Sequence, residues 1–330
     1  MTSGARLPAL APHPLDHVPP ELTGGVVAVG NFDGMHKGHR VLLETARAEA
    51  ERLGAPSVVL TFEPHPRTVF RPEAPVFRLT PLPAKARLLR ALGIGGLVVA
   101  HFDRAFSTIT ADEFVEEVLI GRLKLNTAVI GFNFHFGKGR AGTPALLADA
   151  SKRLGFAIIT CGPVADERGT VSSTAIRDDL TAGDITGANQ LLGYRWFVTG
   201  EVIHGDHRGR TLGFPTANLR LGPDCRLRHG IYAVRLQRAD GSVHDGVASY
   251  GRRPTFDDGP PLLETYLFDF SDDLYGEEVA IFFVRWIRPE VKFPSVEALV
   301  EAVRIDVNTA QRELKDAPPP TPIDEALAAN

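Results

Sequence analysis

His36 and His39 are the residues whose types and spacing most directly suggest chemistry. They lie in a glycine-rich stretch, 30–39, directly after the apolar segment 26–29. Apolar residues at helical spacing follow, at Leu42, Leu43, Ala46, Ala50 and Leu53. A strand that enters a helix through such a turn presents backbone N–H groups and the positive end of the helix dipole, which together attract anions. The stretch therefore predicts a phosphate site, although neither G-x-x-x-x-G-K-[ST] nor G-x-G-x-x-G occurs in it.

The two histidines could instead form a surface pair or belong to a metal site. A metal site needs further Cys or His residues at ligand spacing, and the chain has only Cys161 and Cys225, which lie far apart. The position of the pair directly after a strand and a turn favours phosphate binding.

The stretch also resembles a family signature. Gly30-Asn31-Phe32-Asp33-Gly34-Met35-His36-Lys37-Gly38-His39 is similar to the motif of the FMN adenylyltransferase module of prokaryotic bifunctional FAD synthetases, within the wider H-x-G-H nucleotidyltransferase group. The resemblance implies catalytic roles for His36 and His39. It also implies ATP or phosphate binding by Gly30, Asn31, Phe32 and Gly38.

Two later loops also follow apolar segments that suit buried strands. The segment 57–62 leads into a loop bracketed by prolines, 63–67, and the segment 126–130 leads into 131–140, in which three phenylalanines alternate with polar residues. Ligands of open α/β sheets bind at such loops. A rigid surface turn and ordinary core aromatics are the alternatives. The second loop resembles the family's flavin and nucleotide loop, which implies flavin binding by Asn133, Phe134, Phe136 and Lys138. The position of the first loop after a strand makes His65 and Pro66 candidate flavin-binding residues.

A hydroxyl-rich segment, 171–177, opens another predicted helix. Hydroxyl side chains at a helix start act as caps, and capping is compatible with phosphate binding because both use the same N–H groups. In the H-x-G-H group, the matching S-S-T-x-x-R segment grips the phosphates of ATP. This resemblance assigns phosphate binding to Ser172, Ser173, Thr174 and Arg177.

A second glycine-rich segment, 205–218, carries interleaved cations and ends in Pro215-Thr216-Ala217-Asn218. On its own it could be a hairpin followed by an Asx-type turn. Its run from Gly209 to Asn218 matches the long signature of riboflavin kinases. The resemblance implies phosphate binding by Gly205, Arg210 and Gly213, and Mg²⁺ binding by Thr216 and Asn218, whose oxygens suit that ion.

Further matches to riboflavin kinases follow in family order, and they assign the general base to Glu264 and flavin binding to Arg253. A lone Glu on a strand is usually a solvated residue, so the role of Glu264 depends on the resemblance. Two departures occur in this chain. Ser249-Tyr250 stands where the family usually has Asn-Ile, and Tyr266 stands where it often has His. Both put flavin affinity in question more than the reaction type.

The order of elements predicts two domains. Strands at 57–62, 96–101, 126–130 and 156–161 alternate with helices at 83–92 and 111–123, which indicates a Rossmann-like parallel sheet for residues 1–186. Residues 187–330 contain closely spaced strands at 197–203, 231–236, 243–250, 262–268 and 279–286, which indicate a small antiparallel β-barrel.

The two ends of the chain yield weaker predictions. We expect residues 1–20 to be a partly ordered leader. One amphipathic helix closes the barrel domain, with an apolar face at Val296, Leu299, Val300, Val303, Val307 and Leu314. We expect the tail after Pro318-Pro319-Pro320 to be loose.

Composition narrows the class of protein. The chain has 330 residues, 44% hydrophobic and 23% charged residues, and a formal net charge of −4, which is typical of a globular protein and argues against general nucleic-acid binding. No apolar run reaches the length of a membrane span, and two cysteines make no disulfide framework. We expect a cytoplasmic protein without nucleic-acid or membrane partners, and assembly into a homo-oligomer remains open.

The resemblance therefore implies a bifunctional enzyme that uses ATP and Mg²⁺. The barrel domain would phosphorylate riboflavin to FMN, and the first domain would transfer an adenylyl group from ATP to FMN, giving FAD. One alternative is an adenylyltransferase for another mononucleotide, with a regulatory flavin-binding barrel. A second is a nucleic-acid-binding barrel, which the net charge disfavours.

Overall fold

The computed structural model describes residues 10–167, 169–205, 213–252 and 261–329. The chain divides into two compact units. The first comprises Met1–Val76 and Thr80–Ser172, and the second comprises Phe77–Leu79 and Ser173–Ala329. Within the described ranges, no helix is both long enough and apolar enough to cross a membrane.

A six-stranded sheet forms the centre of the first unit, with the strand order β1-β4-β3-β2-β5-β6 and every pairing parallel. Its strands are β1 (Pro12–Pro14), β2 (Val26–Val29), β3 (Ser57–Glu63), β4 (Gly96–His101), β5 (Thr127–Gly131) and β6 (Ala157–Cys161). The predicted parallel sheet is confirmed. The sequence pattern does not indicate β1, because three residues with two prolines carry no strand signal, yet they pair with Leu97–Val99 at the sheet edge.

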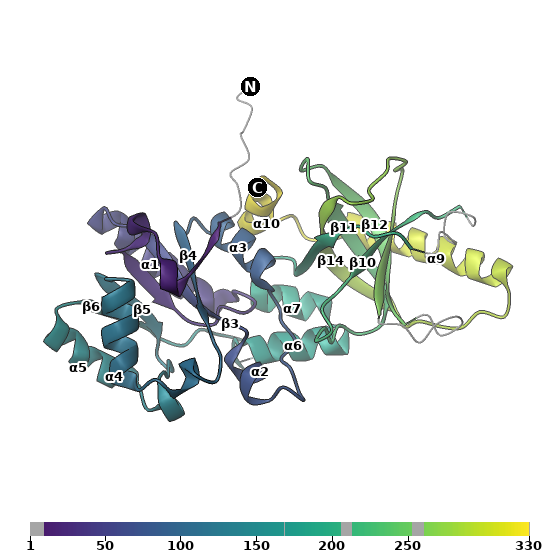
Figure 1. Cartoon of the computed structure of the whole chain (residues 1–330). Coiled ribbons are helices and arrows are strands. Elements are labelled where there is room, and N and C mark those ends of the chain that lie inside the picture. The colour runs from purple at the N-terminus through teal and green to yellow at the C-terminus, as the bar shows by residue number, and fades with distance from the viewer. Residues whose placement is uncertain (1–9, 168, 206–212, 253–260, 330) are drawn as a thin grey trace, which may run out of the picture. The chain divides into compact units, whose positions relative to one another are not determined.

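The described helices of the first unit are α1 (Lys37–Leu53), α2 (Pro66–Phe70), α3 (Leu82–Ala91), α4 (Ala111–Glu113), η4 (Phe114–Arg122) and α5 (Pro144–Leu154), with short 3₁₀ turns η1 (Leu15–His17), η2 (Pro20–Leu22), η3 (Phe106–Thr108) and η5 (Lys138–Arg140). Helices α1 and α5 pack against this sheet, α1 on β2, β3 and β5 and α5 on β6 (Figure 1). The hairpin of β7 (Ala165–Asp166) and β8 (Gly169–Thr170) precedes the second unit.

The helices predicted over 111–123 and after the turn at 30–39 are present, with one difference in detail in each. The helix expected over 111–123 continues after Glu113 as a π-helix, η4, and the N–H of Leu123 donates to the carbonyl of Val118, five residues earlier. On α1, Leu42, Leu43, Ala46 and Ala50 are buried as expected, but Leu53 is 37% exposed because the helix ends there.

An antiparallel barrel forms the second unit, with the order β10-β13-β12-β11-β14-β9. Its strands are β9 (Phe197–Glu201), β10 (Thr216–Arg220), β11 (Gly230–Gln237), β12 (Val243–Gly251), β13 (Leu262–Leu267) and β14 (Glu278–Arg288). A bridge between Ile203 and Asn218 joins the two edges and nearly closes the barrel. The predicted barrel is confirmed. Strand β10 is absent from the predicted strands, because its few residues follow a glycine-rich run that resembles a loop.

Within the described residues, the helices of the second unit are α6 (Ser173–Ala182), α7 (Ile185–Leu192), α9 (Val296–Lys315) and α10 (Pro322–Ala329). The C-terminal half of α9 packs on the barrel through Ala310 and Leu314, whereas Val296 is 55% exposed, so the apolar face predicted for α9 does not extend to its first turn (Figure 1).

The prediction that the tail after Pro320 is loose was wrong. Helix α10 follows the three prolines, with Ile323 and Leu327 buried. The buried Asp324 carboxylate accepts from the backbone N–H of Arg195 at 2.9 Å and from Thr321, and Gln237 donates to the carbonyl of Ala328 at 2.9 Å. These tertiary hydrogen bonds fix the tail, and a run of prolines gives no sign of them.

Candidate active sites

The strand order of the first unit changes direction between β2 and β5. From β2 the chain continues to β3 and β4 on one side, and β5 and β6 lie on the other side. The crevice at the carboxyl ends of two such strands is where open α/β sheets bind ligands. The turn after β2, residues 30–36, and the loop after β5, residues 132–143, both begin at this edge.

His36 and His39 stack on each other at the opening of α1, with ring centroids 3.8 Å apart. His36 is the N-cap, and its Nδ1 accepts the backbone N–H of His39 at 3.3 Å. In the neutral ring this bond leaves the proton on Nε2, which makes that atom a donor to an anion. The geometry thus combines a helix N-terminus with two imidazoles, as the phosphate-site prediction requires.

Close contacts explain the residue types at three predicted positions of the turn. A Cβ atom at Gly38 would lie 3.1 Å from the His36 ring, so a side chain there would press on the imidazole. Phe32 is fully buried at a φ of 45° and packs edge-on against His39, with centroids 5.4 Å apart. Gly30 faces the Phe32 ring and donates its N–H to Leu60 on β3.

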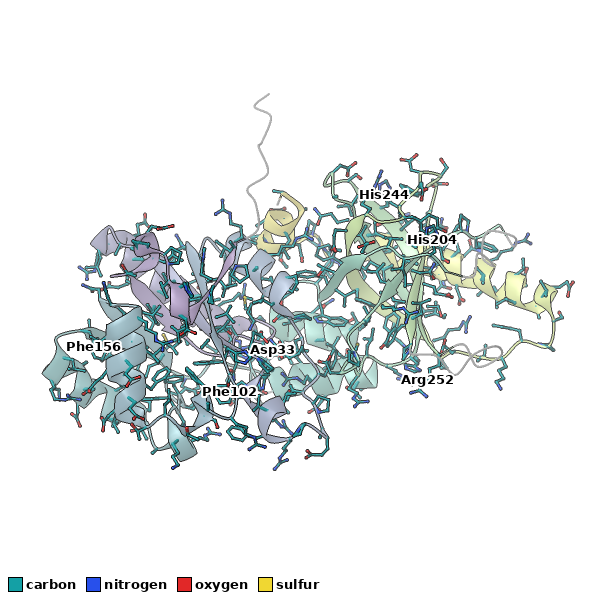
Figure 2. All side chains as sticks on the ribbon, viewed as in Figure 1. Asp33, Phe102, Phe156, His204, His244 and Arg252 are labelled. Carbon is teal, nitrogen blue, oxygen red and sulfur yellow. The ribbon has the colours of Figure 1, made fainter. Side chains whose placement is uncertain are left out.

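Sequence reasoning did not predict the hydrogen bonds that fix this turn to Thr80. Asp33 is 2% exposed and lies inside the first unit (Figure 2). Its carboxylate accepts from the backbone N–H of Thr80 at 2.9 Å, and the Thr80 hydroxyl accepts from the N–H of Gly34 at 2.9 Å. Thr80 is remote from the turn in sequence, and no local pattern in the sequence marks it as a partner of the turn.

The loop after β5 places its aromatic residues in different environments. Phe136 is buried and contacts Phe114 in the core, with centroids 5.2 Å apart, and Phe134 stacks on Phe136 at 5.3 Å. Asn133 and Lys138 are not buried. Gly137, at a φ of 69°, lies so close to α4 that a Cβ would be 2.6 Å from the Ala111 nitrogen. That close approach anchors the start of the Lys138 turn.

The loop after β3 becomes a short helix. His65 caps α2, its Nδ1 accepting from the N–H of Arg67 at 3.2 Å, and Pro66 is the first residue of that helix. The predicted flavin-binding residues of the first unit thus come from the loops after β3 and β5, one on each side of β2.

The hydroxyl-rich segment divides between the two units. Ser172 ends the first unit, and Ser173, Thr174 and Arg177 lie on α6 in the second. The Arg177 guanidinium donates from Nε to the carbonyl of Phe77 at 2.7 Å. Phosphate binding by these four residues stays a prediction.

In the barrel, strand register brings predicted site residues together from distant parts of the sequence. Asn218 on β10 lies opposite Glu264 on β13, and Glu264 lies opposite Ser249 on β12. Thr216 pairs in the same way with Tyr266. Because residues in register and residues two apart share a face, all five stand on one face of the barrel wall.

Asn218 has an unusual environment. It is 3% exposed, and its Nδ2 donates to the Thr216 carbonyl at 3.2 Å, while its Oδ1 has no hydrogen-bond partner in the part of the chain that the structure describes. A buried amide oxygen without a donor is unfavourable. Gly205 lies directly beside it, since a Cβ there would be 2.6 Å from Nδ2. Gly213, at a φ of 86°, has open space around it.

The two departures from the family pattern occupy different surroundings. Ser249 stands beside Glu264 in register, whereas Tyr250 is buried on the other face of the sheet. Tyr266 packs edge-on against Phe214, with centroids 5.2 Å apart, and contacts the cluster under α9. The predicted site residues Arg210 and Arg253 lie outside the described residues.

A second carboxyl group near Glu264 was not predicted. Glu290 lies against the backbone of Gly251, where a Cβ would be 1.9 Å from Oε2. Burial and then the charge of Glu264 raise the pKa of Glu290 to about 7, opposed by Arg288. His229, 3.8 Å from this carboxyl, has its pKa lowered by burial and by Arg252. Arg288 itself forms a two-pronged pair with Asp306 of α9, at 2.7 and 2.6 Å.

A parallel-sheet unit with an H-x-G-H turn and a barrel with a Thr-Ala-Asn strand opposite a glutamate together define a two-domain enzyme of nucleotide transfer. Two family models match the chain: FAD synthetase over residues 18–175 and riboflavin kinase over residues 192–314. The chain belongs to the family of bifunctional riboflavin kinases/FMN adenylyltransferases.

Curated relatives of that name match over nearly their whole length. The protein of Haemophilus influenzae is 41% identical over 290 residues, covering 88% of this chain and 94% of the relative. The protein of Bacillus subtilis is 37% identical over 306 residues, covering 91% and 96%. Neither an adenylyltransferase for another mononucleotide nor a nucleic-acid-binding barrel is favoured by these matches.

A solved structure from Streptococcus pneumoniae has a similar fold, with a TM-score of 0.79 and 32% identity, covering 91% of this chain and 98% of that one. It is described as a macrolide-efflux protein. The two family models and the relatives named above all concern flavin enzymes, so we transfer no efflux role to this chain.

Proposed function

We propose that residues 1–186 carry out adenylyl transfer to FMN and that residues 187–330 phosphorylate riboflavin, so that one chain converts riboflavin to FAD in two steps. The observation that carries this assignment is that each family model matches within one of these ranges. The stacked histidines of the first unit and the Asn218–Glu264 pairing of the second support it.

In the adenylyl transfer, a phosphate oxygen of FMN attacks the α-phosphorus of ATP, the bond from that phosphorus to the bridging oxygen breaks, and pyrophosphate leaves. The nucleophile is already ionised, so no strong base is required. Catalysis then depends on orientation and on stabilising charge at the phosphoryl oxygens. We assign that charge stabilisation to His36 and His39 with Lys138 and Arg177, and orientation of the substrates to Asn31 and Asn133.

In the kinase reaction, the terminal hydroxyl of the ribityl chain attacks the γ-phosphorus of ATP and ADP leaves. A neutral hydroxyl must lose its proton, so a base is needed near it. Glu264 is our candidate, because it stands beside Asn218 and Ser249 on one face of the barrel wall. The proton moves from the hydroxyl to the Glu264 carboxylate.

We assign magnesium binding to Thr216 and Asn218. The buried Asn218 Oδ1, which lacks a donor within the described residues, suits a hard cation that accepts oxygen ligands. A bound Mg²⁺ would neutralise charge on the ATP phosphates.

Cys161 and Cys225 are both free, which fits the reducing cytoplasm that we propose for the protein.

The deciding experiment separates the flavins by chromatography after incubating the full chain with riboflavin and ATP, with Mg²⁺ or with EDTA. We expect FMN first and then FAD with Mg²⁺, and neither with EDTA. FMN that accumulates without FAD would remove the adenylyl-transfer assignment, and no FMN at all would remove the kinase assignment. Turnover in EDTA would contradict the magnesium site.

A further inference from the structure

Lys85 is the most unusual titratable residue of the first unit. It lies on α3 among buried Ala84, Ala86, Leu88 and Leu89, and its own side chain is fully buried. Lysine is rarely buried in this way unless its ammonium group is paired, because removing a charge from water is costly. A lysine at helical spacing from two buried leucines is the one sequence signal that could have revealed it.

The ammonium group of Lys85 lies at hydrogen-bond distance from three acceptors. Nζ is 2.9 Å from the Asn31 carbonyl, 2.9 Å from the Thr61 hydroxyl and 3.1 Å from Oε1 of Glu63. An ammonium group has three donors, so it can serve all of these acceptors at once. The Thr61 hydroxyl also donates to the Asn31 carbonyl at 3.1 Å, which joins the acceptors into one network.

These acceptors belong to two different segments of the proposed site. Asn31 lies in the turn that leads to His36 and His39. Thr61 and Glu63 end β3, directly before the loop that carries His65 and Pro66. Lys85 therefore bonds simultaneously to the proposed ATP turn and to the strand end that holds a proposed flavin loop.

Other hydrogen bonds hold the rest of the turn. Asp33 and Gly34 are bonded to Thr80, which lies a few residues before α3. Neither of those bonds reaches β3. Stability alone gives little reason for the lysine, since a well-packed apolar side chain often replaces a buried ion pair at no cost. The arrangement instead fixes where one substrate loop lies relative to the other.

We propose that Lys85 is a positioning residue for adenylyl transfer, setting the turn at Asn31 against the end of β3 so that ATP and FMN meet in reacting geometry. The proposal rests on the function assigned above to these two loops. Lys85 itself touches neither substrate in this account, and acts through Asn31, Thr61 and Glu63.

The first test is Lys85→Met in the full chain, supplied with FMN and ATP. A misplacement of about 1 Å can cost about 10²-fold in rate, so we expect kcat for FAD formation to fall by about that factor. Dissociation constants for FMN, by flavin fluorescence, and for ATP should stay within about threefold, because each loop keeps its own contacts. Riboflavin phosphorylation in the same preparation is the internal reference and should be unchanged.

Lys152→Met is the matched control, since Lys152 lies on α5 of the same unit with its side chain 78% exposed. It should change neither activity. Thr61→Val is the second test variant. It removes the donor to Asn31 and one acceptor of Lys85 with little change in volume, and we expect about a tenfold loss in kcat with both substrates still bound. This variant decides the question if Lys85→Met does not fold.

Two results would overturn the proposal. One is FAD formation within about twofold of wild type in a folded Lys85→Met or, failing that, in Thr61→Val. The other is a parallel rise of both dissociation constants that accounts for the whole loss, which indicates a merely structural role. The double variant His36→Ala/His39→Ala distinguishes a failure of the site assignment from a failure of the positioning role alone. If it retains FAD formation, the site assignment itself fails; if it loses FAD formation while Lys85→Met does not, only the positioning role fails.

Discussion

In the first unit, His36, His39, His65 and Asn133 lie in segments that follow β2, β3 and β5, whereas in the barrel Asn218 and Glu264 stand on β10 and β13 in direct register. The first arrangement offers helix N–H groups, imidazoles and cations, which suit the transfer of an adenylyl group to an ionised nucleophile. The second places a carboxylate beside a buried amide, which suits a neutral hydroxyl that needs a base. On the proposed assignment, the two units therefore differ in the protonation state of the nucleophile that each one activates.

The strongest challenge to this comparison is to separate the two units. Residues 187–330 alone should convert riboflavin to FMN but give no FAD, because the turn at His36 is absent. The structure refines this experiment. Arg228 donates its backbone N–H to Leu180 of α6 at 3.1 Å and its guanidinium to Ala182 at 2.7 Å. A fragment of residues 173–330 should therefore melt at a higher temperature than 187–330.

Calorimetry and chromatography of the flavins measure both outcomes for the two fragments. A folded fragment without kinase activity would contradict the assignment of that reaction to the barrel.

Glu264→Gln tests whether the barrel site depends on a base. The substitution keeps size and hydrogen bonding but removes proton acceptance, so turnover on riboflavin should fall by about 10²–10⁴-fold. FAD formation from supplied FMN should be unchanged. Glu201→Gln, at the exposed end of β9 in the same barrel, is the control. Riboflavin turnover within about threefold of wild type would mean that Glu264 is only a solvated residue of the wall.

The double variant His36→Ala/His39→Ala tests the opposite side of the comparison. Loss of donors to developing charge costs about 10²–10³-fold, and we expect that loss in kcat for FAD formation more than in KM. FMN formation should stay close to wild type. His17, which lies outside the proposed site, serves as the control when replaced by Ala. Survival of FAD formation within a few fold, about 1 kcal/mol of barrier, would exclude a catalytic role for the pair.

The smallest effect concerns stability. The pKa of Glu290 is raised from 4.5 to about 7, so the folded protein holds this proton more tightly than the unfolded chain does. Its contribution to stability is therefore fully present below 4.5 and is lost as the pH rises through 7. Relative to Glu290→Gln, wild type should lose on the order of 1–3 kcal/mol of unfolding free energy over that window.

Denaturant unfolding of both proteins at several pH values measures this difference. The lowered pKa of His229 acts in the opposite direction, since its contribution is lost as the pH falls, and comparing variant with wild type reduces its influence. Glu278→Gln, exposed on β14, is the control. Identical pH profiles for wild type and Glu290→Gln would contradict the raised pKa.

Local patterns in the sequence determined much of this protein. The alternation of apolar runs and helical spacing predicts the parallel sheet, and the short strands after Gly193 predict the barrel, because periodicity reports which faces are buried. The turn at His36 and His39 is contiguous in sequence, so its N-terminal helix geometry could be read directly. The signature ending at Asn218 identified its residues, although it did not reveal that they begin a strand.

Tertiary structure alone decided the remaining features, because they depend on pairings between distant segments. Strand order placed the crevice between β2 and β5, and register set Asn218 opposite Glu264. The burial of Lys85, the bonds of Thr80 to the turn after β2 and the packing of α10 through Asp324 each join residues that carry no local pattern. A sequence shows which side chains can pair or be buried, but the fold determines which of them actually meet.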